Sequence, residues 1–289
     1  MIEAAAMTTG ARPLVGVGYR SILDEWIRNN LNRFEVLEVT VDNFKVGGEA
    51  SQAAIVDLVG QIPLTAHGIG LSIGTDGPLD FAYLDEIAAI IDRVRATAYS
   101  EHLAFTQVPG YSLGNLLPLP STEAVAESVI AKVRCIQSRI SVPFLLENIT
   151  YLFQWPDSDL SDAEFLNLIC SETGSGLLLD IENLYLNASN HGVDPYAFLD
   201  ALPPGLAKEM HLAGGVTVRE SFLEQPFLAD SHSHRVPDGA WDLLEYALVR
   251  QKPHSIIIER DDRFDAVDEI LDDVTHLRTR IDRVFGAPA

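Results

Sequence analysis

The stretch Gly176-Leu177-Leu178-Leu179-Asp180 is an apolar run of strand length that stops abruptly on an acid. This pattern, a short apolar run that ends on a histidine or an acid, occurs seven times along the chain. The other six runs are 64–67, 98–102, 144–147, 209–211, 227–234 and 255–259. Buried parallel strands are continuously hydrophobic, and in a closed α/β barrel their carboxyl ends converge on one mouth. The pattern therefore predicts a barrel that carries metal-binding groups at its strand ends.

Apolar runs alternate with amphipathic segments throughout the chain, which is the rhythm of a parallel sheet. We expect eight strands, at 14–17, 36–41, 64–66, 97–100, 144–146, 176–179, 209–212 and 255–258. Helices are expected at 80–95, 121–139, 162–173, 238–250 and 265–284. The sequence predicts an α/β fold, a (β/α)8 TIM barrel, in a single domain of residues 1–289, with 1–12 as a flexible N-terminus.

The composition limits the classes of function. The formal charge is −22, and a surface so acidic repels phosphate backbones and anionic lipid, so we expect no nucleic-acid or membrane partner. No apolar run approaches the roughly 20 residues that span a bilayer, and the first 12 residues do not resemble a signal peptide. We therefore expect a cytoplasmic protein. The two cysteines lie far apart, which excludes a thiolate zinc site.

Eight residues at or near the ends of these runs are our candidate metal ligands. They are His67, His102, Glu147, Asp180, His211, Asp230, His232 and Glu259. Such a mixture of nitrogen and oxygen donors suits iron, manganese or zinc, and eight ligands exceed the needs of one tetrahedral ion. Two or three ions fit the count better, and the Glu147 carboxylate is a candidate bridge between two of them.

Further polar residues beside the candidate ligands are expected to support the site or to contact substrate. They are Glu101, Asn148, Glu182, Asn183, His191, His234 and Arg260. Because adjacent strand residues point to opposite faces, only one of Glu101 and His102 can face the barrel axis. We favour His102 as the ligand, with Glu101 orienting an imidazole, and the reverse assignment stays open.

Several of these residues also have a structural interpretation. Asp180 can instead cap a helix N-terminus, and it shares a face with Glu182 only if the extended geometry persists. Arg260 can pair with Glu259. His234 fits a loop position, and His191 is either a loop organiser or a substrate contact.

The ordered set of motifs resembles the multinuclear non-heme iron-dependent oxidative enzymes, a family long known as a domain of unknown function, which includes the oxazolone-forming subunit of methanobactin biosynthesis. The resemblance covers nearly the whole chain. It is carried by Gly16-Val17-Gly18-Tyr19-Arg20, His67–Gly74, Ser100-Glu101-His102-Leu103, Glu147-Asn148, Leu178-Leu179-Asp180, 190–195, 211–214, Asp230-Ser231-His232 and Ile258-Glu259-Arg260-Asp261.

The resemblance implies an α/β barrel that holds two or three iron ions, with O2 as co-substrate, and oxidation of a residue, often cysteine, in a ribosomally made precursor peptide. A separate protein that recognises the peptide is a further expected partner. Position by position, the eight candidate ligands match the family pattern. Three positions depart from it: Gly215 replaces a histidine, Glu182 replaces an asparagine, and Arg260 replaces a tryptophan.

Two other classes of function stay open from the sequence. A divalent-metal barrel hydrolase or isomerase, similar to xylose isomerase or the abasic-site endonucleases, would also place histidines and acids at its strand ends. A catalytically idle barrel that only binds a peptide is disfavoured, because such a binder has no need of eight buried ligands. At Arg260 we expect either a contact to a peptide carboxylate or neutralisation of Asp261 or Asp262 at the surface.

Overall fold

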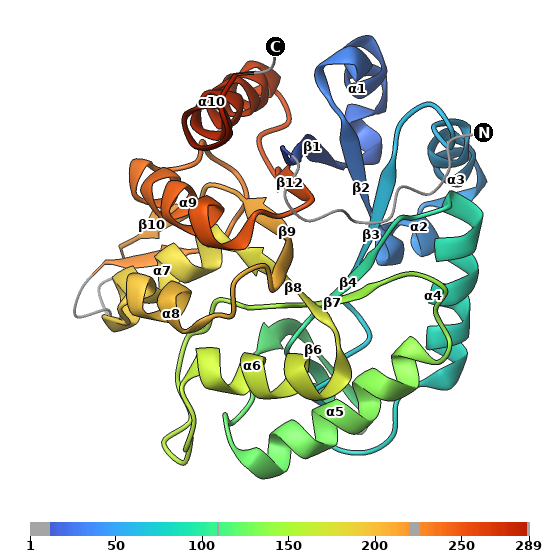
Figure 1. Ribbon diagram of the computed structural model, residues 1–289. Helices are drawn as coiled ribbons and strands as arrows, with labels where there is room; N and C mark the ends of the chain where they lie inside the picture. Colours follow the sequence, from blue (N-terminus) through green and yellow to red (C-terminus); the bar gives the residue numbers. More distant parts are fainter. Residues whose placement is uncertain (1–11, 109, 220–225, 288–289) are drawn as a thin grey trace. The chain divides into compact units, whose positions relative to one another are not determined.

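The computed structural model describes residues 12–108, 110–219 and 226–287. The flexible start expected at 1–12 therefore lies outside the described residues, except for Arg12. Eight strands form a closed parallel barrel in the order β1-β12-β9-β8-β7-β4-β3-β2 (Figure 1), which confirms the predicted fold. These strands are β1 Leu14–Tyr19, β2 Val36–Thr40, β3 Leu64–Gly68, β4 Tyr99–His102, β7 Phe144–Glu147, β8 Gly176–Asp180, β9 Ala207–Leu212 and β12 Ser255–Ile258.

Helices connect most of the strands, and the five predicted helices are all present within a few residues of their expected ends. Among the described residues the α-helices are α1 Asp24–Asn29, α2 Val41–Val46, α3 Gly48–Asp57, α4 Phe81–Val94, α5 Glu123–Gln137, α6 Asp162–Thr173, α7 Ile181–His191, α8 Pro195–Ala201, α9 Asp238–Gln251 and α10 Val267–Phe285. The hydroxyl of Thr122 accepts from the Val125 N–H and so caps α5, while Ser161 and Glu164 form a capping box on α6.

Two antiparallel hairpins interrupt the loops that follow the strand ends. The first pairs β5 Phe105–Val108 with β6 Tyr111–Leu117, and the second pairs β10 Val216–Val218 with β11 Phe227–Ala229. The apolar run that precedes Asp230 is therefore a hairpin strand and not a barrel strand. Among the described residues, no helix combines the length and the apolar character that crossing a membrane requires.

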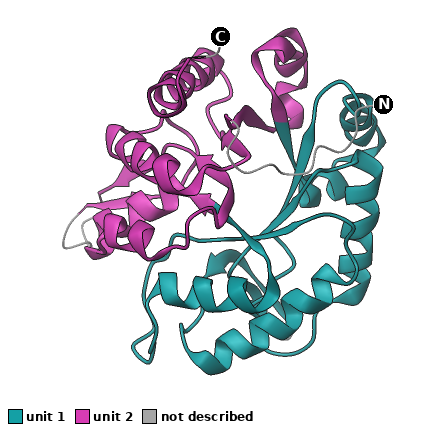
Figure 2. Cartoon of the chain, in the orientation of Figure 1, with its two compact units in different colours: residues 1–6, 37–178 teal, residues 7–36, 179–289 magenta. Residues whose placement is uncertain are grey.

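The chain divides into two compact units (Figure 2). Unit 1 consists mainly of residues 37–178, and in it β3 pairs with β2 and β4, while β7 pairs with β4 and β8. Unit 2 contains the described residues of 7–36 and 179–289, and in it β12 lies between β1 and β9. In each unit the residues of the barrel strands are buried almost without exception, which explains their continuous hydrophobicity.

Truncating a leucine in a buried strand is expected to destabilise the protein strongly. Leu177 of β8 is fully buried, so Leu177→Ala removes apolar contacts, leaves a cavity, and should lower the free energy of unfolding by about 2–5 kcal/mol. Leu152→Ala is the control in the same unit, because Leu152 is 64% exposed. Urea unfolding of both variants measures the difference, and equal stability would contradict the assignment of Leu177 to the core.

Candidate metal clusters

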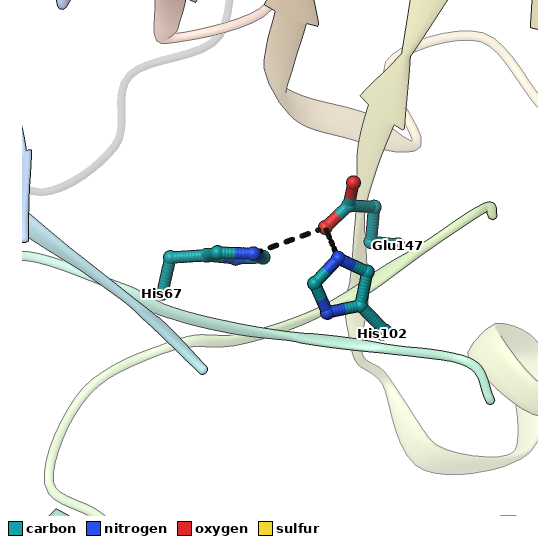
Figure 3. A group of neighbouring side chains, drawn as sticks. All are labelled: His67, His102 and Glu147. Carbon is teal, nitrogen blue, oxygen red and sulfur yellow. Dashed lines mark ion pairs between the residues drawn. The ribbon is translucent and has the colours of Figure 1, made fainter. Parts of the chain in front are cut away.

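Three predicted ligands of unit 1 converge at the ends of neighbouring strands; we call His67, His102 and Glu147 the first cluster. His67 lies on β3, and His102 and Glu147 are register partners at the ends of β4 and β7. Both imidazoles point at one carboxylate oxygen, with Nε2 to Oε2 distances of 3.4 Å from His67 and 3.3 Å from His102 (Figure 3). The three ligand atoms lie within 4.8 Å of one another, so one metal ion can contact all of them.

Hydrogen bonds on the far side of each ring fix the orientation of both imidazoles. The His102 Nδ1 lies 3.1 Å from the Gly68 carbonyl oxygen, which can only accept a hydrogen bond. The His67 Nδ1 lies 2.8 Å from the Ser100 Oγ, and Ser100 donates its own proton to the Ala66 carbonyl oxygen. In a neutral ring, Nδ1 then carries the proton and Nε2 presents a lone pair. Two lone pairs and a carboxylate therefore converge, as a cation requires.

Glu101 does not orient an imidazole, contrary to our expectation. Its carboxylate accepts a hydrogen bond from the Tyr99 hydroxyl at 2.7 Å, and burial raises the pKa of Glu101 to about 8. Gly68 packs against this pair, because a Cβ at that position would lie 2.1 Å from the Glu101 Oε2. This glycine is therefore required by the packing of these two side chains.

Unit 2 contains a second set of predicted ligands; we call Asp180, His232 and Glu259 the second cluster. One ligand atom from each lies within 4.8 Å of the others. Asp180 ends β8 and at the same time caps α7, since its Oδ1 accepts from the Asn183 N–H at 2.7 Å. Burial, opposed by His211, raises the pKa of Asp180 to about 7. The capping and the ligand interpretations of Asp180 are thus compatible.

His232 is held between carboxylates in an unusual backbone conformation. Its Nε2 lies 2.7 Å from the Asp230 Oδ1, and its Nδ1 lies 3.0 Å from the Asp261 Oδ2. Its φ of 45° is in the left-handed region, which a non-glycine residue adopts at an energetic cost and which is found preferentially at functional sites. Burial alone would lower its pKa, but Glu259, Asp230 and Asp261 outweigh burial and raise the pKa well above its usual value.

Glu259 connects the second cluster to two further residues. Its Oε2 lies 2.9 Å from the His211 Nδ1, and its Oε1 lies 3.2 Å from the Arg20 Nη2. Burial would raise the pKa of Glu259, but His211, His232 and Arg20 hold it well below the ordinary value. Arg20 also pairs with Asp261. Arg20 was not among the predicted site residues, although it ends the motif Gly16-Val17-Gly18-Tyr19-Arg20 directly after a barrel strand.

The remaining predicted residues occupy varied positions. Asn148 is half-buried directly after Glu147, and Asn183 is buried in the first turn of α7. His191 ends α7, so it lies roughly 16 Å along the helix from Asp180 and outside the second cluster. His234 is exposed and its Nδ1 contacts the Ser233 Oγ at 2.7 Å, as expected for a loop residue. Glu182 follows Asp180 on the helix, so the extended geometry that we considered does not persist.

Arg260 is buried beside α10. It is 2% exposed, it donates to the Ser233 carbonyl oxygen, and it faces Glu269 and Asp273 of α10. None of the three partners considered for it, Glu259, a peptide carboxylate or the adjacent acids Asp261 and Asp262, agrees with this position. Arg260 instead fixes the loop after β11 to α10.

Removing the hydroxyl that orients His67 is expected to weaken metal binding without unfolding the barrel. Ser100→Ala removes the hydroxyl that contacts the His67 Nδ1, and loss of such an outer partner costs about 10- to 100-fold in metal affinity. The control is Ser141→Ala, because Ser141 is exposed and its Oγ contacts Asp92. Metal affinity measured against a competing chelator should fall only for Ser100→Ala; equal affinities would remove Ser100 from the site.

These features define an α/β barrel with two clusters of imidazoles and carboxylates that can hold metal ions. Residues 14–282 match the family model of RiPP precursor modification enzymes, MbnB/TglH/ChrH, where RiPP denotes a ribosomally synthesised and post-translationally modified peptide. The chain belongs to this family. A UPF0276 protein of Caulobacter vibrioides is 35% identical over 262 residues, covering 91% of this chain and 90% of the relative.

Solved structures with similar folds include a xylose isomerase domain protein and an endonuclease IV, and their low identity shows the fold alone. A xylose isomerase domain protein from Planctomyces limnophilus has a TM-score of 0.62 at 12% identity and covers 96% of this chain and 100% of that chain. Endonuclease IV from Thermus thermophilus has a TM-score of 0.58 at 16% identity and covers 94% of this chain and 100% of that chain.

Proposed function

We propose that this protein is a multinuclear non-heme iron enzyme that uses O2 to oxidise a residue of a ribosomally synthesised precursor peptide. Membership of the peptide-modifying family supports the peptide substrate. The convergence of the His67 and His102 Nε2 atoms on the Glu147 carboxylate is the observation that carries the metal. The second cluster, in unit 2, offers another nitrogen and oxygen donor set, so we propose two or three ions per chain.

The donor chemistry favours iron over a purely structural zinc. Neither cluster includes a cysteine, and two imidazoles with one carboxylate are a set that iron(II) oxygenases use with open positions for reactants. When bound, iron would supply the electrons for O2 reduction, which no protein side chain of these clusters can supply.

The residues of the chain have the tasks of holding and orienting the reactants. Ser100 and the Gly68 carbonyl fix the two imidazoles of the first cluster, so that the ligand atoms need no rearrangement when an ion binds. Asp230 and Asp261 hold His232, and Arg20 limits the negative charge at Glu259. A substrate residue, which is often cysteine in the family, would be placed against the ions by the surrounding loops.

Metal analysis and a peptide assay test this proposal together. Protein expressed in iron-rich medium and purified without oxygen should contain more than one iron per chain, counted by elemental analysis and Mössbauer spectroscopy. A short precursor peptide encoded beside the gene, incubated with the enzyme, should change mass only when O2 is admitted. One zinc and no iron per chain, with an unchanged peptide, would point instead to a hydrolase or isomerase.

A further inference from the structure

The peptide bond between Gly68 and Ile69 connects the first cluster to Asp42, an acid of α2 that belongs to neither cluster. The carbonyl oxygen of this peptide unit lies 3.1 Å from the His102 Nδ1, and its N–H donates to the Asp42 Oδ2 at 2.8 Å. A peptide unit is planar, and no described peptide bond is cis, so the two groups point in opposite directions on one rigid plane. A contact that holds the N–H therefore also sets the direction of the carbonyl.

This peptide plane needs a support, because it lies between two glycines, whose backbone rotates more freely than that of other residues. At both glycines a phenol and a carboxylate occupy the space that a side chain would fill. A Cβ on Gly68 would lie 2.4 Å from the Tyr99 hydroxyl, and a Cβ on Gly70 would lie 2.6 Å from the Tyr83 hydroxyl. The Tyr83 hydroxyl donates to the Asp42 Oδ1. Asp42 is thus fixed by α4 on one side and holds the loop after β3 on the other.

The place of Asp42 in the first turn of α2 does not explain these contacts. An acid in a first turn stabilises a helix by facing the N–H groups of that helix. The two Asp42 oxygens instead contact groups outside α2, namely the Ile69 N–H and the Tyr83 hydroxyl. Packing does not replace the first of these contacts, because Ile69 is 40% exposed. The hydrogen bond from Asp42 is therefore the contact that restrains this peptide plane from the side opposite His102.

We propose that Asp42 is a positioning residue for His102 and acts through the peptide bond between Gly68 and Ile69. The carboxylate at the N–H polarises the amide and makes its carbonyl oxygen a stronger acceptor. A stronger hydrogen bond at the His102 Nδ1 fixes the ring and makes its Nε2, which faces Glu147, a better metal ligand. This inference rests on the proposed function in one respect, namely that a metal ion binds the first cluster.

Binding of Zn²⁺ to the metal-free protein tests the assignment, because this ion binds imidazole and needs neither O2 nor peptide. Zn²⁺ is diamagnetic, so NMR of protein with isotope-labelled histidine can detect the His102 Nδ1 proton, which is assigned by its absence in His102→Ala. Growth of this signal at Zn²⁺ concentrations set by a chelator gives the affinity of the first cluster. The rate at which the proton exchanges with water reports the strength of its hydrogen bond to the Gly68 carbonyl.

Removing the Asp42 carboxylate should weaken both properties. Asp42→Ala should bind Zn²⁺ at the first cluster roughly 3- to 10-fold more weakly, a smaller loss than the roughly 10- to 100-fold caused by removing a direct partner of a ligand. The His102 Nδ1 proton should also exchange faster. Asp42→Asn keeps an oxygen that can accept from the Ile69 N–H but loses the charge, so it should fall between Asp42→Ala and the wild type.

Gly70→Ala breaks the same connection without removing any of its groups. The added methyl group would lie 2.7 Å from the Asp42 Oδ1 and 2.6 Å from the Tyr83 hydroxyl, so it should displace the carboxylate. The variant should therefore show the weaker Zn²⁺ binding and the faster proton exchange of Asp42→Ala.

Thr122→Ala separates positioning from stability. The Thr122 hydroxyl also accepts from a backbone N–H of unit 1, that of Val125, but it caps α5 and does not contact the loop after β3. Asp42→Ala and Thr122→Ala should both lower the melting temperature of the metal-free protein. Only Asp42→Ala should change the Zn²⁺ affinity of the first cluster and the exchange of the His102 proton.

Two outcomes would overturn the assignment. One is a wild-type Zn²⁺ affinity and exchange rate in Asp42→Ala, or in Asp42→Asn and Gly70→Ala if Asp42→Ala does not fold. The other is an equal loss in Thr122→Ala, since the effect would then follow from stability alone. Failure of the proposed function is seen separately, as wild-type protein that contains no iron or leaves the precursor peptide unmodified.

Discussion

Glu147→Gln is expected to abolish peptide modification and to lower the affinity of the first cluster for metal by at least about a hundredfold. Glu147 is the one carboxylate of that cluster, and the Nε2 atoms of both histidines lie 3.3–3.4 Å from its Oε2. Glutamine preserves the size of the side chain but removes the anionic charge. The cluster would then offer two neutral imidazoles and an amide, a much weaker set for a divalent ion.

The same substitution should leave the fold intact. Glu147 is buried, and without a bound ion its charge has to be balanced by the protein alone, so the neutral isostere should not destabilise the metal-free barrel. Glu172→Gln is the control, because Glu172 belongs to the same unit and makes an exposed ion pair with Arg134. Iron per chain and the mass change of the peptide are measured for both variants. Full metal content in Glu147→Gln would exclude Glu147 as a ligand.

The barrel was predictable from sequence because its strands carry a local signal. Runs such as Ser255–Ile258 are buried on both faces and are therefore continuously apolar. The β5–β6 hairpin lacked this signal, since most residues of Tyr111–Leu117 are exposed, and Ser112, Gly114 and Asn115 interrupt its apolar residues. Its pairing depends on a turn and on backbone hydrogen bonds, which the pattern of hydrophobic residues does not report.

The first cluster was also predictable, because each candidate ligand lies at the end of a short run of strand length. The residues that orient these ligands were harder to identify. Ser100 reaches His67 only because His67 and Ser100 are register partners across β3 and β4, although 33 residues separate them. Register between strands is a tertiary property, and a single sequence contains no direct measure of it.

Arg260 illustrates how the residues adjacent in sequence can suggest the wrong ion-pair partner. The acids nearest to it in sequence are Glu259, Asp261 and Asp262, which suggested an ion pair with one of them. In the structure its guanidinium is buried against α10, whose Glu269 and Asp273 lie 9 and 13 residues further along the chain. Asp261 instead forms an ion pair with Arg20. The choice of partner was thus set by the packing of a helix on the barrel and not by proximity in sequence.

Metal uptake by the second cluster is expected to strengthen as pH rises above 7, by about tenfold per pH unit up to the pKa of His232. Although burial opposes it, the carboxylates of Glu259, Asp230 and Asp261 raise the pKa of this imidazole well above its usual value. At neutral pH the ring therefore carries a proton that a metal ion has to displace. Calorimetry in buffers of different ionisation enthalpy should show proton release when metal binds at pH 7.

The stability of the metal-free protein should change with pH in the opposite direction. A histidine whose pKa is raised by folding contributes stability that is fully present below its unfolded pKa of about 6.5 and is lost as pH rises through the folded pKa. His232 is such a group. Alkaline pH should therefore weaken the metal-free fold while it favours the metal-bound form, and the stabilisation by metal should be larger at pH 8 than at pH 6.

Asp261→Asn tests whether carboxylates hold this proton. Asp261 contacts the His232 Nδ1 at 3.0 Å but is not a member of the second cluster, so the substitution removes a proton-holding charge and leaves the ligands in place. The pKa of His232 should fall, and both the proton release at pH 7 and the pH dependence of the affinity should decrease. Asp262→Asn changes the neighbouring exposed acid, which contacts the Arg263 N–H, and should match the wild type. If Asp261→Asn keeps the wild-type dependence on pH, the proton displaced by the metal is not held on His232 by this carboxylate.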